Sequence, residues 1–353
     1  MAPEDPNPAH PLYNTTFSLL RVSPLYTGRH GPLSNATLRK HAQRFRDILV
    51  GEVLRGVRVG LGTKEDDVLS RVGALQTVTW RQLPEEQAWS AADETGSAHD
   101  DVATGLALLC RGMIVTVAYE KIEYRAILLR DGRGDDADAS SMGTGGKETD
   151  DGFQSFPLLM TKMPGSLREA FTEFLASTFD TRVSALCLSS QYLVSAFERY
   201  LADISMGEDG EPLGLIERSR ALRHTIKETL VVIGFDIPGG SAALKTIDIN
   251  IAREDLPRMV ARGKTIGRQG DGDSPFFEAL TTYIKGHMAL DLRNEKVKIS
   301  RIACGAFVLG SEGKIKLTQL PSESDGQSSR GPATRRLING LIGAAAGVLL
   351  SGG

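Results

Sequence analysis

The stretch NTTFSLLRVSPLYTGRHGPLSNATLRKHAQRFRDILV, residues 14–50, places an extended segment directly before an amphipathic helix. Residues Leu12–Tyr26 predict a strand that ends at Ser23-Pro24, because the residue before a proline avoids helical backbone angles. In the following segment apolar side chains recur at steps of three and four, the period of one helix face. These side chains are Leu38, Ala42, Phe45, Leu49 and Val53.

Strands and helices continue to mix along the rest of the chain without the alternation of a βαβ fold. The pattern therefore predicts an α+β protein with mainly antiparallel sheets, flanking helices and a C-terminal helix. Further strands are predicted at 57–61, 74–80, 113–119, 122–130, 153–163, 224–237, 245–252, 296–302, 304–310 and 314–320. Further helices are predicted at 167–178, 190–204, 254–262, 275–290 and 332–350. Pro157 suggests that the strand at 153–163 is an edge strand or carries a bulge.

The composition is that of a globular protein, with 41% hydrophobic and 24% charged residues among 353 and a net charge of −3. This composition excludes collagen-like, coiled-coil and fully disordered chains. The first ten residues lack the basic start and apolar run of a secretory signal, and the three cysteines are widely spaced. We therefore expect an intracellular protein without a disulfide framework.

Charge is segregated along the chain. Residues 10–60 carry eight cations against two anions, whereas 84–101 has six acids and no Lys or Arg, and 131–151 has seven acids against two cations. The two acidic segments are also rich in small polar residues, which predicts flexible loops. The resulting organisation is a disordered N-terminus at 1–11, an α+β lobe at 12–204 with acidic loops 84–101 and 131–151, a second lobe at 217–320, a linker at 321–331 and a helix at 332–350.

No motif for catalysis, metal binding or a cofactor stands out, so the sequence predicts no catalytic, cofactor-binding or metal-ligating residue. Gly263-Lys264-Thr265 lacks the first glycine of a phosphate-binding loop, the histidines have no metal-ligand spacing, and no nucleophile elbow is present. The apolar run at 337–350 is too short to span a bilayer, which argues against a membrane protein. An enzyme with a dispersed site and a tail-anchored adaptor remain as alternatives.

Two groups of cations stand out as candidates for binding the backbone of duplex DNA without sequence specificity. The first lies on the predicted helix and consists of Arg39, Lys40, Arg44 and Arg46. If the strands at 296–302 and 314–320 pair, the second group shares one face opposite Val297, Ile299, Ile315 and Leu317; it consists of Lys296, Lys298, Lys314 and Lys316. A solvated sheet face with lysines that protect an edge is the competing interpretation.

The first strand carries a specific resemblance. It is similar to a signature of the centromere protein L (CENP-L) family, including its fungal kinetochore members, that reads roughly T-L-x-x-[LV]-[ST]-P-L-Y. Later elements follow the family's order, with Phe156-Pro157-Leu158 before a helix that ends near Phe179-Asp180, and Gly313–Lys316 before the terminal helix. The resemblance covers about residues 12–350, and the acidic loops and the Gly/Ala-rich terminal helix depart from it. The matching signature residues are Thr16, Phe17, Leu19, Val22, Ser23, Pro24, Leu25 and Tyr26.

The resemblance implies curved antiparallel sheets and a non-enzymatic inner-kinetochore subunit in the nucleus, at the centromere. It implies a heterodimer with a CENP-N-like protein and contacts with other inner-kinetochore subunits, in the constitutive centromere-associated network on CENP-A nucleosomes. It implies neither a cofactor nor a membrane, and a homodimer is left open. From apolar content and position, we expect a partner interface at Val297, Ile299, Phe307, Leu309, Leu337, Leu341 and Ile342.

Overall fold

The structure, a computed structural model, describes residues 10–28, 33–54, 72–83, 112–130, 152–207, 210–235, 245–267, 274–319 and 330–347. The predicted acidic loops, the strand at 57–61 and most of the N-terminal segment and the linker lie outside these residues. The chain divides into two compact units. The first contains residues 1–10, 17–185 and 341–353, and the second contains 11–16 and 186–340. The predicted lobe limits at 204 and 217 fall within the second unit.

The first unit is built on an antiparallel sheet with the strand order β1-β7-β5-β4-β3. A short strand, β8 (Val183–Ala185), also pairs with β1, and β2 (Leu25–Tyr26) pairs with β6 (Phe153–Gln154). The predicted hairpin at 113–130 is confirmed as β4 and β5. The main strands are β1 (Thr16–Val22), β3 (Leu75–Leu83), β4 (Gly112–Tyr119), β5 (Glu123–Leu129) and β7 (Leu158–Lys162).

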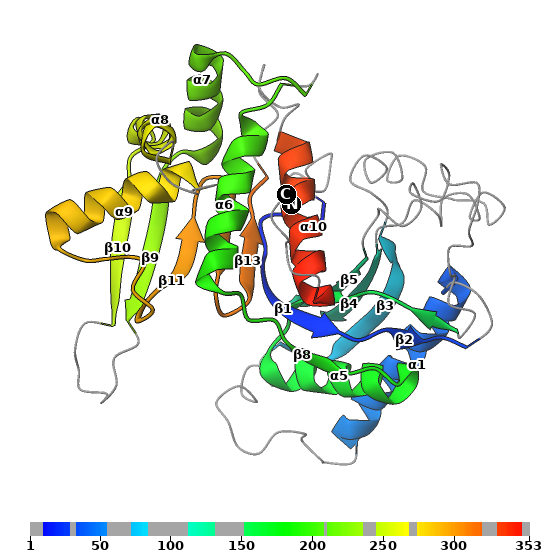
Figure 1. Cartoon of the computed structure of the whole chain (residues 1–353). Helices are drawn as coiled ribbons and strands as arrows, with labels where there is room; N and C mark the ends of the chain where they lie inside the picture. Colours follow the sequence, from blue (N-terminus) through cyan, green and yellow to red (C-terminus); the bar gives the residue numbers. More distant parts are fainter. Residues whose placement is uncertain are drawn as a thin grey trace. The chain divides into compact units, whose positions relative to one another are not determined.

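Two helices, α1 (Asn35–Leu54) and α5 (Gly165–Phe179), pack against one face of this sheet (Figure 1). Aromatic rings fill the space between them. The ring centroid of Phe45 lies 5.4 Å from that of Phe171 and 5.1 Å from that of Phe174. Trp80 of β3 is buried against the same rings. The apolar face predicted for α1 is therefore a face of the core.

The strand β7 is not an edge strand, which was one of the two possibilities that Pro157 suggested. It pairs with β1 on one side and with β5 on the other, so it lies inside the sheet. Pro157 is compatible with this position because it immediately precedes the strand. It needs no amide donor there, and its carbonyl oxygen accepts a hydrogen bond of 2.9 Å from the backbone N–H of Val22.

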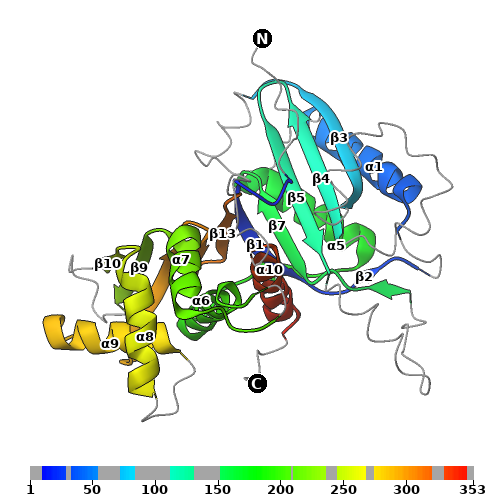
Figure 2. The same cartoon turned by 90° about the horizontal axis from the view of Figure 1, so that it is seen from above.

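The second unit has an antiparallel sheet with the order β10-β9-β11-β12-β13 and helices against one of its faces (Figures 1 and 2). The strands are β9 (Thr229–Phe235), β10 (Thr246–Ile251), β11 (Val297–Ala303), β12 (Phe307–Gly310) and β13 (Lys314–Leu317). The helices are α6 (Ser190–Ile204), α7 (Leu215–Ile226), α8 (Asp255–Gly267), α9 (Pro275–Met288) and α10 (Arg330–Ala346), of which α10 continues into the first unit at Leu341. The predicted α+β class with mainly antiparallel sheets and a C-terminal helix is confirmed.

The helix α7 replaces the start of a predicted strand. The strand expected at 224–237 begins only at Thr229, because residues up to Ile226 continue α7. Leu222, Thr225 and Ile226 are buried and follow helical steps of three and four. The β-branched residues Thr225 and Ile226 therefore belong to the buried face of a helix and not to a strand. Lys227 then ends the helix with a positive φ of 54°.

The glycine of Gly263-Lys264-Thr265 has a packing role. The triplet lies inside α8, whereas a phosphate-binding loop joins a strand to the start of a helix. A Cβ added at Gly263 would overlap the carbonyl oxygen of Pro275, the first residue of α9. Residue 263 therefore lets the backbones of α8 and α9 approach each other.

We expect Gly263→Ala to lower the free energy of unfolding by roughly 1–3 kcal/mol, because the added methyl group pushes α8 away from α9. Urea or thermal unfolding measures the change. Gly286→Ala in α9 is the matched control, since nothing lies within 4 Å of its added Cβ and alanine is the better helix former. Equal stabilities of the two variants would contradict this packing role.

A second prediction concerns His41, whose ring lies 4.9 Å from that of Phe179 and 6.0 Å from that of Trp80. Burial, assisted by the charge of Arg44, lowers the pKa of His41 below its ordinary value of 6.5. Between that lowered value and 6.5 the unfolded chain binds a proton that the folded chain does not, so the free energy of unfolding falls as the pH falls through this window. We expect His41→Phe to flatten this fall in denaturant unfolding at pH 5 to 8; an unchanged slope would contradict the assignment.

Candidate functional site

The sheet of the second unit has one buried and one open face. Ile302, Leu309 and Ile315 lie side by side in register on β11, β12 and β13, and all three are buried. On the same face, the ring of Phe307 lies 5.0 Å from that of Tyr200 in α6. Because successive side chains on a strand point to opposite faces, alternate residues face away from the helices. These include exposed Arg301, Lys314 and Lys316.

The two lysine-bearing strands do not pair directly, which was the condition set for a shared lysine face, because β12 lies between β11 and β13. The shared face is nevertheless formed across β12, where Arg301 and Lys314 are both in register with Gly310. Since glycine has no side chain, it leaves the space between the two cations open. Lys298 is exposed on β11, and Lys296 is exposed in the turn before that strand.

Arg301 was missed because the strand does not alternate regularly. Strict alternation from Lys296 and Lys298 would turn Ser300 outward and Arg301 inward. A β-bulge lies between Ile299 and Arg301, and the Ser300 hydroxyl donates a hydrogen bond to the Val232 carbonyl oxygen at 3.1 Å. The sequence shows only that Ile299 and Ile302 are three positions apart; that both are buried, which requires the bulge, is seen in the structure.

The second cation group belongs to the first unit, on α1. Arg39, Lys40 and Arg44 are exposed, and Arg46 is half-buried. Buried Leu38, Ala42, Phe45 and Leu49 occupy the opposite face of the helix. The amphipathic pattern therefore orients these cations toward solvent.

The residues predicted for the partner interface lie mostly in the interior. Val297 is half-buried, while the side chains of Ile299, Phe307, Leu309, Leu337, Leu341 and Ile342 are buried. In addition, β11 and β12 each have a strand on both sides. A partner in this region must therefore use exposed groups or a sheet edge, and the assignment to these side chains stays a prediction.

The outer strand β10 offers such an edge. It ends the strand order and pairs with β9 on one side, while no described residue pairs with its other side. Residues 246–251 alternate between exposed polar side chains and isoleucines, and Ile247 and Ile249 are only half-buried on the face of the helices. Unpaired backbone amides and carbonyls along such an edge can bind an added strand.

The helix α9 continues past β10 in both views (Figures 1 and 2). Its C-terminal half carries exposed Tyr283 and Met288, with side chains 45% and 47% accessible. Tyr283 also stacks on His287, with ring centroids 4.3 Å apart. The helix that continues past this edge therefore carries two exposed apolar side chains, in addition to the backbone groups that the edge itself offers.

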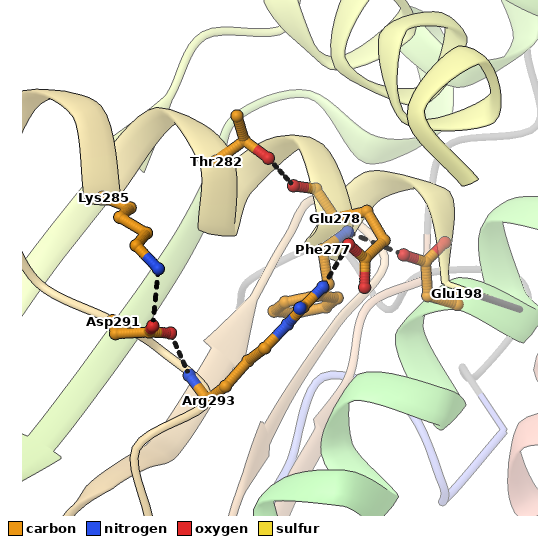
Figure 3. Close-up of polar contacts among 7 residues, drawn as sticks. All are labelled: Glu198, Phe277, Glu278, Thr282, Lys285, Asp291 and Arg293. Atoms are coloured by element: carbon orange, nitrogen blue, oxygen red, sulfur yellow. Dashed lines mark hydrogen bonds and ion pairs between the residues drawn. The ribbon is translucent and has the colours of Figure 1, made fainter. Parts of the chain in front are cut away.

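Polar contacts hold α9 at both ends (Figure 3). At the start, the buried carboxylate of Glu198 in α6 accepts a hydrogen bond of 2.9 Å from the Phe277 N–H. Arg293, in the turn after the helix, forms an ion pair of 2.6 Å with Glu278 in the first turn of α9. At the end of the helix, Lys285 and Asp291 form an ion pair of 3.0 Å. The Arg293 backbone N–H and the Lys285 ammonium lower the pKa of Asp291. Exposed ion pairs contribute little stability, but together these contacts fix the turn from α9 into β11.

The described residues contain no group of three or more His, Cys, Asp or Glu side chains placed to hold a metal ion. In the same part of the chain, none of the helices combines the length and the apolar character needed to cross a membrane.

Comparison with known proteins identifies the family. Residues 11–346 match the family model of CENP-L, centromere protein L. The inner kinetochore subunit fta1 of Schizosaccharomyces pombe (strain 972) is 22% identical over 162 residues, which cover 46% of this chain and 47% of fta1. The chain thus spans about half the length of that curated relative. On the family match, which extends over most of its length, this chain belongs to the centromere protein L (CENP-L) family.

Proposed function

We propose that this chain is a non-enzymatic inner-kinetochore subunit that forms a heterodimer with a CENP-N-like protein. In this role it helps to assemble the constitutive centromere-associated network on CENP-A nucleosomes during chromosome segregation. Membership of the CENP-L family makes it a nuclear protein of the centromere and kinetochore. The name of its relative fta1, an inner kinetochore subunit, supports the same role.

The observation that carries the proposal is the open edge of β10 beside α9. An extended partner segment that pairs with β10 satisfies the edge amides and carbonyls, and its alternate side chains pack under Tyr283 and Met288. Backbone pairing supplies affinity, while the helix surface selects apolar side chains at every second position. A strand of six residues, as long as β10, is about 20 Å long, so the edge is long enough for specific recognition.

Co-expression with the CENP-N-like protein of the same organism, followed by size-exclusion chromatography, tests the partnership. We expect one co-eluting complex for the unchanged chain. The double variant Tyr283→Glu/Met288→Glu should weaken it at least tenfold, because it places two buried charges against the added strand. Both side chains are exposed in the free chain, so the variant should fold.

The matched control is Ile48→Glu, a change at an exposed apolar side chain of α1. It should leave the complex intact. Separate elution of two folded proteins would contradict the partnership. Co-elution that the double variant does not weaken would instead contradict the location at β10 and leave the partnership standing.

We further propose that the cationic face of the second unit contacts the phosphate backbone of duplex DNA. Arg301, Lys314 and Lys316 lie on a face without helices, and their charges suit nonspecific binding to phosphates. Lys314 also forms an exposed ion pair with Glu312, which phosphate can replace at little cost. The cations of α1 are a second candidate surface for the same interaction.

Binding to a 20-base-pair duplex as a function of salt measures both surfaces. Removing one cation that binds a phosphate should reduce the slope of log K against log salt by about 0.9. We expect the triple variant Arg301→Ala/Lys314→Ala/Lys316→Ala to reduce the slope by about 0.9 for each of two to three lost phosphate contacts. The quadruple alanine variant at Arg39, Lys40, Arg44 and Arg46 should also reduce the slope, as an independent test of the α1 surface. Arg258→Ala, an exposed arginine of α8, is the control. An unchanged slope for either variant would exclude its surface.

A further inference from the structure

An open pocket of about 750 Å³ lies in the second unit, at the end of the strands where α7 turns into β9. Leu230, Asn250 and Ala303 lie in one row across β9, β10 and β11 and contribute to its wall. Ala252, Cys304 and Gly305 also line it. Burial raises the pKa of Cys304 to about 11, so this thiol is neutral and adds no charge. This part of the wall is therefore formed by mostly small, mostly apolar residues that carry no charge.

The rim of the pocket is cationic at one side. Arg223 and Lys227 line it, and among the described residues neither has a carboxylate within ion-pair distance. The pKa of Glu254 is lowered by its hydrogen bond with Arg253 and also by the charge of Arg223. The Arg223 Nε donates to the Ser219 carbonyl oxygen at 3.1 Å, which orients the guanidinium and leaves its terminal nitrogens available. Arg253 and Glu254, also at the rim, are paired with each other at 2.6 Å. Outside the Arg253–Glu254 pair, Arg223 and Lys227 carry two positive charges against the one negative charge of Glu228, so the pocket favours an anionic group.

Lys227 is held in an unusual conformation. Its φ of 54° and ψ of −128° are close to the backbone angles of the first central residue in a type II′ turn, a position that favours glycine. A side chain in this region costs about 1–3 kcal/mol, and the surroundings must enforce it. The Gly305 N–H donates to the Ile226 carbonyl oxygen at 2.7 Å, and a Cβ added to Gly305 would lie 3.0 Å from the Lys227 Cγ. Glycine would form this turn without strain, so the fold itself does not require a lysine there.

We propose that this pocket binds an acidic peptide segment of a protein partner, with a carboxylate between Arg223 and Lys227 and an adjacent apolar side chain on Leu230 and Ala303. Charge complementarity and the apolar wall favour this occupant. Duplex DNA fits less well, because Glu228 and Glu254 also line the pocket and would repel a continuous row of phosphates. Asn250 of β10 lines the pocket, so the site adjoins that strand, but its cations Arg223 and Lys227 lie outside β10 and the proposal does not depend on the partner proposed there.

A phage library of random 12-residue peptides provides the probe. The library is first depleted on the double variant Arg223→Ala/Lys227→Gly, which removes peptides that bind elsewhere, and is then selected on the full unchanged chain. We expect the surviving peptides to share Asp or Glu beside an apolar residue. A synthetic survivor should bind at least tenfold more weakly to either single variant by fluorescence anisotropy, and its amide-for-acid version should lose binding to the same extent.

Two variants separate binding from folding. Lys227→Gly relieves the positive φ, so its melting temperature should equal or exceed that of the unchanged chain while peptide binding is lost. Arg258→Ala lies outside the pocket and should bind normally. A selection that leaves no enriched peptide, or survivors without acidic residues, would overturn the proposal. If no such peptides are found and both pocket variants bind a labelled 20-base-pair duplex more weakly than the unchanged chain does, the pocket binds nucleic acid and the proposal is overturned.

Discussion

The register of β11, β12 and β13 decides which side chains of the second unit serve the core and which remain for binding. Ile302, Leu309 and Ile315 form one buried row, and Phe307 on the same face meets the rings of α6. Once this row is buried, alternation along the strands turns the cations outward. The open cationic face is therefore a consequence of the way in which the core is packed, and it needs no separate structural element.

The same sheet explains why interaction surfaces of different chemistry coexist on one unit. The face away from the helices is polar and cationic, whereas the edge at β10 offers backbone groups beside an apolar helix. Ion pairs and a buried carboxylate cap fix α9 where it passes the edge. The partner and DNA contacts proposed for this subunit would use different parts of this sheet, an edge for the first and a face for the second.

The sequence predicted elements with strong local periodicity well. The helix at 190–204 is found as α6 with the same limits, and the hairpin at 113–130 as β4 and β5. Prediction from the sequence failed where tertiary contacts determine the secondary structure. The helix α7 was missed because it begins with Leu215 and Ile216, which are exposed at 82% and 84% and obscure the apolar face of the helix. The strand at 304–310 was predicted and is found as β12, but local periodicity does not give the order of strands in a sheet, so its place between the lysine strands did not follow from the sequence. The pocket could not be predicted, because its lining comes from segments separated in sequence and joined only by the sheet.

The bulge in β11 has a consequence for how this strand can vary. Ile299 and Ile302 both point into the core because one extra residue, Ser300, is accommodated between two paired positions. Deletion of Ser300 would leave Ile299, Arg301 and Ile302 in regular alternation, because they already pair with the consecutive residues Ile233, Val232 and Val231 of β9. Both isoleucines would then stay in the core, and Arg301 would stay on the open face. The strand can therefore lose its extra residue without turning over, whereas loss of a paired residue would shift one half of the strand relative to the other.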